Sequence, residues 1–345
     1  MRRLISWLAL LMFCLSAHAS PRENVLSLVA GEWVAQALYA VTKLDVADKL
    51  LDGPQTIDVL AKQTACHQEN LYRLLRMLAS VGVFHEGENR RFSNTANSEL
   101  LTKDHPESLR SLILFYGAEM SDSWRRVLDC AREGKPAFEL EFGEPVFAYF
   151  REHPASAALF NAAMREKSKA VISACLHAYD FSRFTAVYDI GGGLGHFLTA
   201  LLQSNPQQRG VLYDLPQVIT VAQMPFRERC ELSSGDFFES IPKSGDAYLL
   251  KSVLHDWSDQ DALRILQRCH EAMGAHAKLV IVETIIASAN KRDYAKCIDA
   301  HMMVITGGKE RTLADFQSLL ASAGFSIVSV TPTDTEFSII EACKK

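Results

Sequence analysis

Apolar residues recur at helical spacing through the first third of the chain. The stretch VLSLVAGEWVAQALYAVTKLDVADKLL (25–51) has this spacing and predicts an amphipathic helix. Two shorter helical patterns and one polar ribbon follow, at residues 57–65, 70–84 and 85–95. Helices followed by a short ribbon are the layout of a winged helix. The pattern therefore predicts a mainly helical, winged-helix-like domain at residues 21–115, and a helical connector at 116–180.

The pattern changes near residue 185, where continuous apolar runs alternate with helical stretches. The runs lie at residues 186–190, 210–214, 230–234, 247–253 and 278–284. Such strands, separated by helices, are typical of a parallel sheet that is covered on both faces. Two last runs, 325–333 and 336–344, are joined by a polar link too short for a crossover helix, so they predict an antiparallel hairpin. The predicted fold class is therefore α/β, with a seven-stranded sheet in residues 181–345.

Composition and charge narrow the class of protein. Apolar residues make up 48% of the chain and charged residues 22%, as in globular proteins. The net charge of −5 gives no electrostatic reason to expect nucleic acid or an anionic membrane as a partner. Arg73, Arg76, Arg90 and Arg91 in the front domain could suit DNA, so a winged-helix DNA-binding regulator with a ligand-sensing domain remains an alternative. The acidic charge and the apolar helices favour a packing or dimerisation domain.

The start of the chain and its cysteines give conflicting indications of location. Arg2 and Arg3 precede an apolar run and the small residues of Ala17-His18-Ala19, which is the layout of a secretory signal peptide in residues 1–20. A mis-assigned start codon is the alternative, since Met12 lies inside the run. Eight scattered cysteines without a C-x-x-C motif favour a reducing, cytoplasmic compartment.

A glycine-rich turn follows the first predicted strand, in the sequence DIGGGLGHF (189–197). Glycines at this point let a ligand approach the backbone at the carboxyl edge of the sheet. The spacing does not suit NAD, because the sixth position from Gly191 is His196 and the sixth from Gly193 is Leu198. Both are too bulky for the close helix–strand packing of G-x-G-x-x-G. The turn instead suits a ligand without a diphosphate, such as a nucleoside that carries an amino acid.

Acids end the next two predicted strands. Asp214 can accept hydrogen bonds from the hydroxyls of a ribose, and Asp236 can accept one from an adenine amino group while Phe237 packs on the ring. Strand-end acids also serve as helix caps and turn formers. Their agreement with the glycine-rich turn at three consecutive strand ends favours a ligand site.

His255 follows the fourth predicted strand, in KSVLHDWSD (251–259), and so belongs to the same edge. Histidine is the side chain best suited to accept a proton near neutral pH. A base needs an orienting partner on its other ring nitrogen, and two candidates exist, Glu283 and Glu310. Glu310 could instead pair with Arg311. Ser258 or Asp259 can cap the helix that follows.

Five motifs together resemble a known family. DIGGGLG, LYDLP, SGDFF, LLKSVLHDWSD and GGKERT are similar in order and spacing to S-adenosylmethionine (SAM) dependent O-methyltransferases. The similar group is the dimeric one that includes plant phenolic, acetylserotonin and bacterial polyketide O-methyltransferases. The resemblance runs from about residue 25 to the C-terminus. It implies a class I methyltransferase Rossmann-like fold, a homodimer and a small hydroxylated aromatic or conjugated substrate.

The resemblance also implies roles for individual residues. Cofactor contacts are implied for Gly191, Asp214, Asp236, Phe237 and Lys251. His255 is implied as the general base, with Glu283 and Glu310 as catalytic glutamates, and Asp256 also matches a family position. Phe160, Met164 and Met302 are implied to line the substrate pocket. No residue has the signature of a magnesium ligand, so we expect SAM as cofactor and no metal. SAM is a cytoplasmic metabolite, which supports a cytoplasmic location. A SAM-binding scaffold without catalysis is a further alternative, against which the intact His255 and Glu283 argue.

Overall fold

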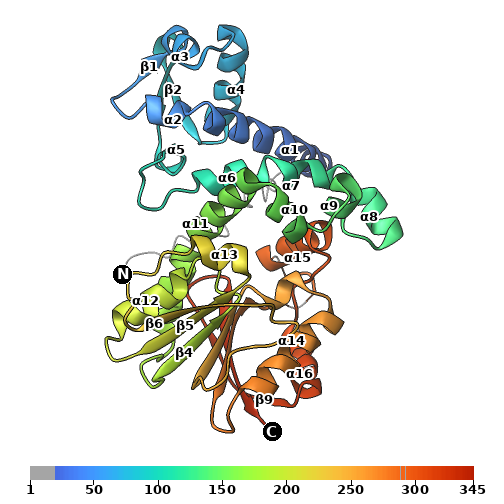
Figure 1. Cartoon of the computed structure of the whole chain (residues 1–345). Helices are drawn as coiled ribbons and strands as arrows, with labels where there is room; N and C mark the ends of the chain where they lie inside the picture. Colours follow the sequence, from blue (N-terminus) through green and yellow to red (C-terminus); the bar gives the residue numbers. More distant parts are fainter. Residues whose placement is uncertain (1–19, 288, 292) are drawn as a thin grey trace. The chain divides into compact units, whose positions relative to one another are not determined.

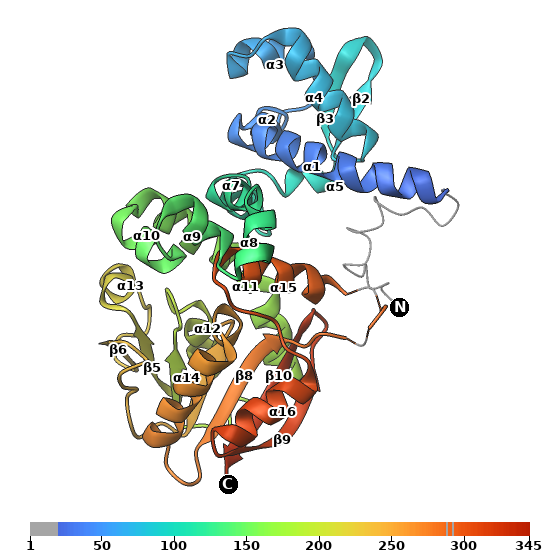
Figure 2. The ribbon, with the colours of Figure 1, turned by 90° about the vertical axis from the view of Figure 1, so that its right-hand side faces the viewer.

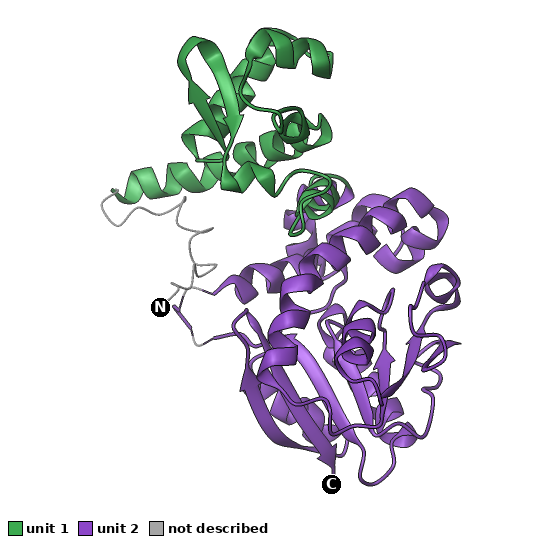
Figure 3. Ribbon diagram, turned by 90° about the vertical axis from the view of Figure 1, so that its left-hand side faces the viewer, with its two compact units in different colours: residues 1–118 green, residues 119–345 purple. Residues whose placement is uncertain are grey.

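The structure is a computed structural model that describes residues 20–287, 289–291 and 293–345. The segment interpreted as a signal peptide therefore lies, apart from residue 20, outside the described residues. The chain forms two compact units that divide between Ala118 and Glu119 (Figure 3).

The first unit is mainly helical. Its helices are α1 (Pro21–Lys43), α2 (Val46–Lys49), α3 (Ile57–Thr64), α4 (Gln68–Ser80), α5 (Ala96–Glu99) and α6 (Arg110–Tyr116). Its strands are β1 (Gln55–Thr56), β2 (Phe84–Gly87) and β3 (Arg91–Asn94), with a 3-10 turn, η3 (Glu88–Arg90), between the last two. The strands form a small antiparallel sheet in the order β1-β3-β2. The predicted ribbon is present, and each predicted helix is present in part; the helix predicted at residues 70–84 ends at Ser80, and Phe84 begins β2. The strand β1 has two residues and was not predicted.

The single helix predicted at residues 25–51 is wrong in its last part. Asp45 has a φ of 55°, in the left-handed region, so the backbone leaves α1 and begins α2 with a change of direction. Leucines of α4 and the aromatic side chains Phe84 and Phe92 form the core beneath. Arg90 pairs with Glu69 at 2.8 Å and lies over the ring of Tyr72, so this arginine is engaged within the unit.

The second unit begins with helices and continues as an α/β domain (Figure 1). The leading helices are α7 (Glu119–Trp124), α8 (Val127–Glu133), α9 (Ala137–Phe142), α10 (Val146–Glu152) and α11 (Pro154–Ala178). The later helices are α12 (His196–Ser204), α13 (Pro216–Val221), α14 (Asp259–Ala272), α15 (Tyr294–Ile305) and α16 (Leu313–Ser322), with a 3-10 turn η4 (Leu254–Asp256). The strands are β4 (Ala186–Ile190), β5 (Arg209–Asp214), β6 (Cys230–Ser234), β7 (Ala247–Lys251), β8 (Lys278–Thr284), β9 (Phe325–Pro332) and β10 (Phe337–Lys344).

These strands form one seven-stranded sheet in the order β6-β5-β4-β7-β8-β10-β9. The first five run parallel to one another, and β10 pairs antiparallel with both β8 and β9. The predicted seven strands and C-terminal hairpin are confirmed. The hairpin forms one edge of the sheet, where β10 pairs with β8 and β9 is the outermost strand.

Alternate residues of the central strands enter two apolar cores. In β8, Leu279 and Ile281 pack with α14 and α16, whereas Val280 and Val282 pack with α11 and α12. Figure 2 shows α14 and α16 together over β8, β9 and β10. Cover on both faces explains why these strands read as continuous apolar runs.

The carboxyl ends of β4, β5, β6, β7 and β8 lie at one edge of the sheet, and Asp214, Asp236, Lys251, His255 and Glu283 each lie at or just beyond one of them. The remaining predicted acid, Glu310, comes from the loop between α15 and α16. The strand predicted at 247–253 ends two residues early. Ser252 has a φ of 53°, and this left-handed residue turns the chain from β7 into η4. A non-glycine residue in this region is strained, which is frequent at functional sites.

Candidate functional site

The glycine-rich turn between β4 and α12 leaves room beside the backbone. Gly191, Gly193 and Gly195 have φ values of 66°, 59° and 76°, which glycine adopts most readily. A Cβ atom on Gly193 would meet nothing within 4 Å, whereas one on Gly192 would lie 2.6 Å from Cγ of Asp189. The turn is therefore packed on its inner side and open at Gly193, as a ligand cradle requires.

Asp214 binds this turn. Its Oδ2 accepts a hydrogen bond from the backbone N–H of Gly193 at 2.8 Å, and its Oδ1 accepts one from Leu215 at 2.7 Å. The turn-forming alternative for Asp214 is thus present in the structure. A carboxylate has about four acceptor positions, so two bonds leave capacity for ribose hydroxyls. Burial raises the pKa of Asp214, and these two backbone bonds oppose the rise.

Asp236 and Phe237 lie beyond the end of β6. Asp236 Oδ1 accepts the N–H of Phe238 at 2.8 Å, so this acid also forms a local turn. The ring of Phe237 packs at 5.9 Å, edge to face, on Trp257, which follows η4. The expected adenine position thus touches the His255 segment.

Asp189 was not singled out from the sequence, although only Ile190 separates it from the first glycine of the turn, Gly191. Its side chain is buried, and its Oδ2 has no hydrogen-bond partner among the described residues. Burial raises the pKa of Asp189 to about 7; the charge of Lys251 opposes the rise and that of Asp214 adds to it. An unsatisfied buried acceptor behind an open turn fits a site that binds a polar ligand.

Lys251 is the last residue of β7 and donates a hydrogen bond to Oγ of Ser168 in α11, at 3.0 Å. Burial lowers its pKa, as does nearby Lys167, while Asp189 and Glu283 oppose this. The side chain of Lys251 is thus held toward α11 at the end of β7. Ser168 had not been predicted.

His255 lies in the centre of η4, which the residues on both sides fix. Leu254 is fully buried, and Ser258 caps α14 by accepting the N–H of Asp261 at 3.1 Å. Of the two predicted caps, Ser258 is therefore the one used. Asp259 instead binds Lys309 and Arg311, at 2.5 and 3.0 Å.

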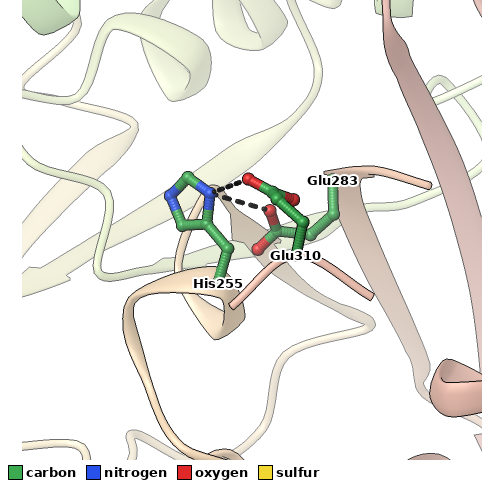
Figure 4. A group of neighbouring side chains, drawn as sticks. All are labelled: His255, Glu283 and Glu310. Carbon is green, nitrogen blue, oxygen red and sulfur yellow. Dashed lines mark hydrogen bonds and ion pairs between the residues drawn. The ribbon is translucent and has the colours of Figure 1, made fainter. Parts of the chain in front are cut away.

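Both predicted glutamates reach the same nitrogen of His255, at unequal distances. Nδ1 lies 2.7 Å from Oε1 of Glu310, a hydrogen bond, and 3.7 Å from Oε2 of Glu283. Figure 4 shows this nitrogen facing the two carboxylates while the other points away from them. Asp256 Oδ1 is 3.8 Å from Nε2. With Nδ1 bonded to a carboxylate, Nε2 is the nitrogen that can exchange a proton with a substrate.

The electrostatics of the group follow from burial and proximity. Burial disfavours the charged imidazolium, but Glu283, Asp256 and Glu310 outweigh it and raise the pKa of His255 to about 9. Burial raises the pKa of Glu283 to about 7, against the opposing charge of His255. Burial also tends to raise the pKa of Glu310. The direct hydrogen bond with His255 outweighs this effect and holds the pKa of Glu310 below the usual value. Glu310 is therefore the ionised partner.

Glu283 has a second task. Its Oε1 accepts the backbone N–H groups of Val253 and Leu254, both at 2.9 Å, so it fixes the start of η4. Glu310 is supported in turn by the hydroxyl of Thr284, which donates to its Oε2, and by Asp299, which accepts its backbone N–H at 2.9 Å. Neither Thr284 nor Asp299 had been predicted; Thr284 directly follows Glu283, while Asp299 has no local signal.

Aromatic rings connect the predicted substrate residue Phe160 with the predicted adenine residue Phe237. Phe160 packs edge to face with Phe147 at 6.3 Å, and Phe147 stacks on Trp257 at 6.1 Å. Trp257 in turn contacts Phe237. The structure thereby brings Phe160 into one aromatic row with the loop that carries His255.

Met302 is buried in α15, three residues beyond Asp299. Met164 is half-buried in α11, one turn beyond Phe160. Beside Met302, His301 Nδ1 accepts the indole N–H of Trp124 at 3.1 Å. Burial lowers the pKa of His301 to about 3, with added repulsion from Lys167 and His255, so its imidazole is neutral. A separate cavity of about 350 Å³, lined by residues 176–182 with Ser204 and Asn205, contains none of the predicted site residues.

One ligand atom each from His255, Glu283 and Glu310 lies within 4.8 Å of the others, close enough for a cation. The nitrogen nearest the carboxylates is already hydrogen-bonded to one of them. The geometry is therefore that of an imidazole with its orienting acids.

Comparison with known families accounts for both units of the chain. The O-methyltransferase domain matches residues 124–326, and the O-methyltransferase dimerisation domain matches residues 26–104. The first match alone covers more than half of the chain.

Similar proteins span nearly the full length of the chain. A phenazine O-methyltransferase of Lysobacter antibioticus is 41% identical over an alignment of 332 residues, and the match covers 94% of this chain and 97% of that protein. An 8-amino-8-demethylriboflavin N,N-dimethyltransferase of Streptomyces davaonensis is 37% identical and covers 89% of this chain and 91% of its own.

Solved structures agree in fold. Human N-acetylserotonin methyltransferase in complex with SAM superposes with a TM-score of 0.87 at 26% identity, over 96% of this chain and 99% of that one. A methyltransferase of calicheamicin biosynthesis, solved with S-adenosylhomocysteine (SAH) bound, gives 0.83 at 31% identity, over 95% and 100%.

Proposed function

Because the chain belongs to the O-methyltransferase family with an N-terminal dimerisation domain, it is a SAM-dependent small-molecule methyltransferase, and we propose that it methylates a hydroxyl group with His255 as general base. The acceptor we propose is an aromatic or conjugated compound. The observation that carries the proposal is the hydrogen bond from His255 Nδ1 to Glu310, which leaves Nε2 for the substrate proton.

The residues at the sheet edge fit SAM. The turn is open at Gly193, Asp214 has acceptor capacity for a ribose, and Asp189 holds an unsatisfied oxygen. We assign Gly191, Asp214, Asp236, Phe237 and Lys251 to this cofactor. When bound, SAM supplies an electrophilic methyl group on a sulfonium cation. The part of this chain is to hold the cofactor, align the acceptor and remove its proton.

His255 must be neutral to accept that proton. A phenol has a pKa of about 10, so a base whose pKa is raised to about 9 is well matched to it. Glu310 stabilises the imidazolium that forms when the proton arrives. A cationic ligand nearby would oppose the imidazolium and lower the pKa of His255 toward neutrality.

Relatives in the family methylate nitrogen as well as oxygen, so the acceptor atom is a separate question. A hydroxyl gains most from a base, because it becomes a strong nucleophile only when its proton leaves. The buried His255–Glu310 pair therefore favours oxygen. The aromatic row from Phe160 to Phe237 offers flat apolar surface, and we assign Phe160, Met164 and Met302 to the acceptor pocket.

We also propose that the first unit forms a homodimer, as its match to a dimerisation domain suggests. The helix α1 exposes a cluster of large apolar side chains, namely Val25, Leu26, Leu28, Val29 and Trp33. By length and mean hydropathy α1 is also the one described helix that could cross a membrane. It lies largely within the dimerisation domain, so a second copy of the chain is the better occupant of this face.

The decisive experiment uses SAM with a labelled methyl group and a panel of phenols, hydroxylated polyketides and hydroxyphenazines, each paired with its amino analogue. Mass spectrometry should detect labelled product from hydroxyl acceptors. His255→Ala should bind SAH normally by calorimetry yet lose about 100-fold or more of the rate. His276→Ala, which alters an exposed histidine, is the control. Wild-type turnover by His255→Ala would refute the base assignment, and exclusive methylation of the amines would refute oxygen as acceptor.

A further inference from the structure

Arg311 follows Glu310 directly and is almost completely buried, with 1% of its surface exposed. The ion pair between these neighbours that the sequence left open does not form. Glu310 binds the ring of His255, whereas the acid bound by Arg311 is Asp259. Two adjacent residues thus extend to different parts of the His255 segment.

The guanidinium of Arg311 holds η4 from both sides. Its Nη1 donates to the carbonyl of Leu254 at 2.7 Å, and its Nη2 donates to the carbonyl of Trp257 at 3.0 Å. These carbonyls flank His255 and Asp256 in the sequence. Nε donates to Oδ1 of Asp259 at 3.0 Å, which fixes the plane of the group. A planar fork suits this arrangement, and the point charge of a lysine could not reproduce it.

The backbone on the other side of this contact is fixed as well. The carbonyl of Arg311 accepts the N–H of Ile286 at 3.0 Å, just beyond β8. A Cβ atom on Gly308 would lie 2.1 Å from the carbonyl oxygen of His255, so the two segments touch through their main chains. The segment that carries Glu310 is therefore joined to η4 by one side-chain fork and one close backbone contact.

We propose that Arg311 is a positioning residue that sets the distance between His255 and Glu310 by clamping η4 to the segment 307–311. The inference rests on the proposed role of His255. It adds that Arg311 positions the side chains of His255 and Glu310 relative to each other without contacting either of them. It does so through the main-chain carbonyls of Leu254 and Trp257. The charged or titratable groups that act on His255 include Asp256 on η4, Glu283 at the end of β8, Glu310 and, on α15, His301. The charge of Lys167 on α11 acts on Asp256, Glu310 and His301.

The test is a pH titration of His255, monitored by NMR of the whole protein with labelled histidine. The resonance of His255 is identified by its absence from the spectrum of His255→Ala. Arg311→Lys keeps the charge but loses the fork. We expect the Glu310 contact to loosen, so that the pKa of His255 falls toward that of an ordinary histidine. The kcat should fall roughly 10- to 100-fold with KM for SAM unchanged. Arg264→Lys is the matched control, since Arg264 pairs with Asp261 on the exposed side of α14.

A purely structural role would lower Tm and leave the titration of His255 unchanged, and that result overturns the proposal. If Arg311→Lys does not fold, Asp259→Asn decides. This partner is 57% exposed, and its loss removes one anchor of the guanidinium. A smaller fall in the pKa of His255 supports the clamp, and an unchanged titration refutes it. The NMR measurement needs no turnover, so it remains valid even if the protein proves to methylate nothing in the panel.

Discussion

His255 and Glu310 are 55 positions apart in the sequence, and their side chains meet at 2.7 Å between Nδ1 and Oε1. Glu283 approaches the same nitrogen only to 3.7 Å. Oε1 of Glu283 instead accepts hydrogen bonds from the backbone N–H groups of Val253 and Leu254, both at 2.9 Å, in the segment that leads to His255. The two glutamates therefore have different roles. Glu310 orients the imidazole of His255, and Glu283 orients the backbone segment that carries His255.

The rate of methyl transfer should rise with pH. In our proposal His255 is the base and must be neutral to accept a proton, and its carboxylate neighbours raise its pKa to about 9 against the effect of burial. Activity should therefore increase from about pH 6 and reach half of its maximum near pH 9, or at a lower pH where the cationic cofactor lowers the pKa of His255. Initial rates at saturating SAM across this range, in buffers of constant ionic strength, provide the check. A rate that falls steadily with pH contradicts a neutral base.

Glu310→Gln should move this profile to lower pH. The amide can still accept a hydrogen bond from His255, but it no longer stabilises the imidazolium by its charge. The pKa of His255 should fall, and the limiting rate should drop by about tenfold or more because the base is weaker. Glu271→Gln, which changes an exposed partner of Arg268, should leave the profile unchanged. The comparison uses the same pH–rate measurements.

Replacement of Glu283 should affect stability according to whether an acceptor remains. Glu283→Ala leaves the buried N–H groups of Val253 and Leu254 without a partner, which costs about 1–3 kcal/mol for each group. Glu283→Gln retains an oxygen and should lose much less. Thermal unfolding should show a Tm several degrees lower for the alanine variant than for the glutamine variant. Equal Tm values would mean that these two bonds contribute little.

Asp214→Ala should weaken cofactor binding more than it weakens the fold. The carboxylate holds the N–H of Gly193 and, in our proposal, a ribose hydroxyl. Hydrogen bonds to a charged group contribute about 1.5–3 kcal/mol, so the affinity for SAH should fall roughly 10- to 100-fold. Titration calorimetry with SAH gives the Kd. Asp334→Ala, in the exposed turn between β9 and β10, is a control that should bind normally.

Chelation should not abolish activity. The His255 group uses the nitrogen nearest its carboxylates for a hydrogen bond, and we expect no divalent cation to be required. Enzyme dialysed against EDTA should retain its full rate, and added magnesium should not increase it. Loss of activity on dialysis that returns with one particular metal would show that the three side chains act as ligands.

A charge on the exposed face of α1 should separate the proposed dimer. Trp33 is 61% exposed in the single chain. Trp33→Glu would place a carboxylate in an apolar interface, so light scattering after size exclusion should shift from the dimer toward the monomer mass. Val328 on β9 is 52% exposed, and Val328→Glu is the matched control that should remain dimeric. A wild-type protein that is monomeric would exclude the interface itself.

Much of the fold could be predicted because buried positions are occupied by apolar residues, and their spacing can be recognised in the sequence. Continuous apolar runs indicated the parallel strands, and the short polar link before Phe337 indicated the hairpin. Local backbone conformation left a weaker trace. Nothing in the apolar pattern indicates that Asp45 and Ser252 adopt a positive φ, so α1 was predicted too long and β7 two residues too long. The strand β1 has only two residues, too few for a period to be visible.

The sequence by itself determined which residues reach the site edge, because parallel strands end together and Asp214, Asp236, Lys251, His255 and Glu283 each lie at or just beyond a strand end. Only the tertiary structure decided how they pair. Glu310 rather than Glu283 bonds the imidazole, and Arg311 grips carbonyls around His255 rather than its neighbour Glu310. Such pairing depends on distances of a few ångströms between segments that the chain order leaves far apart, and no local pattern encodes these distances.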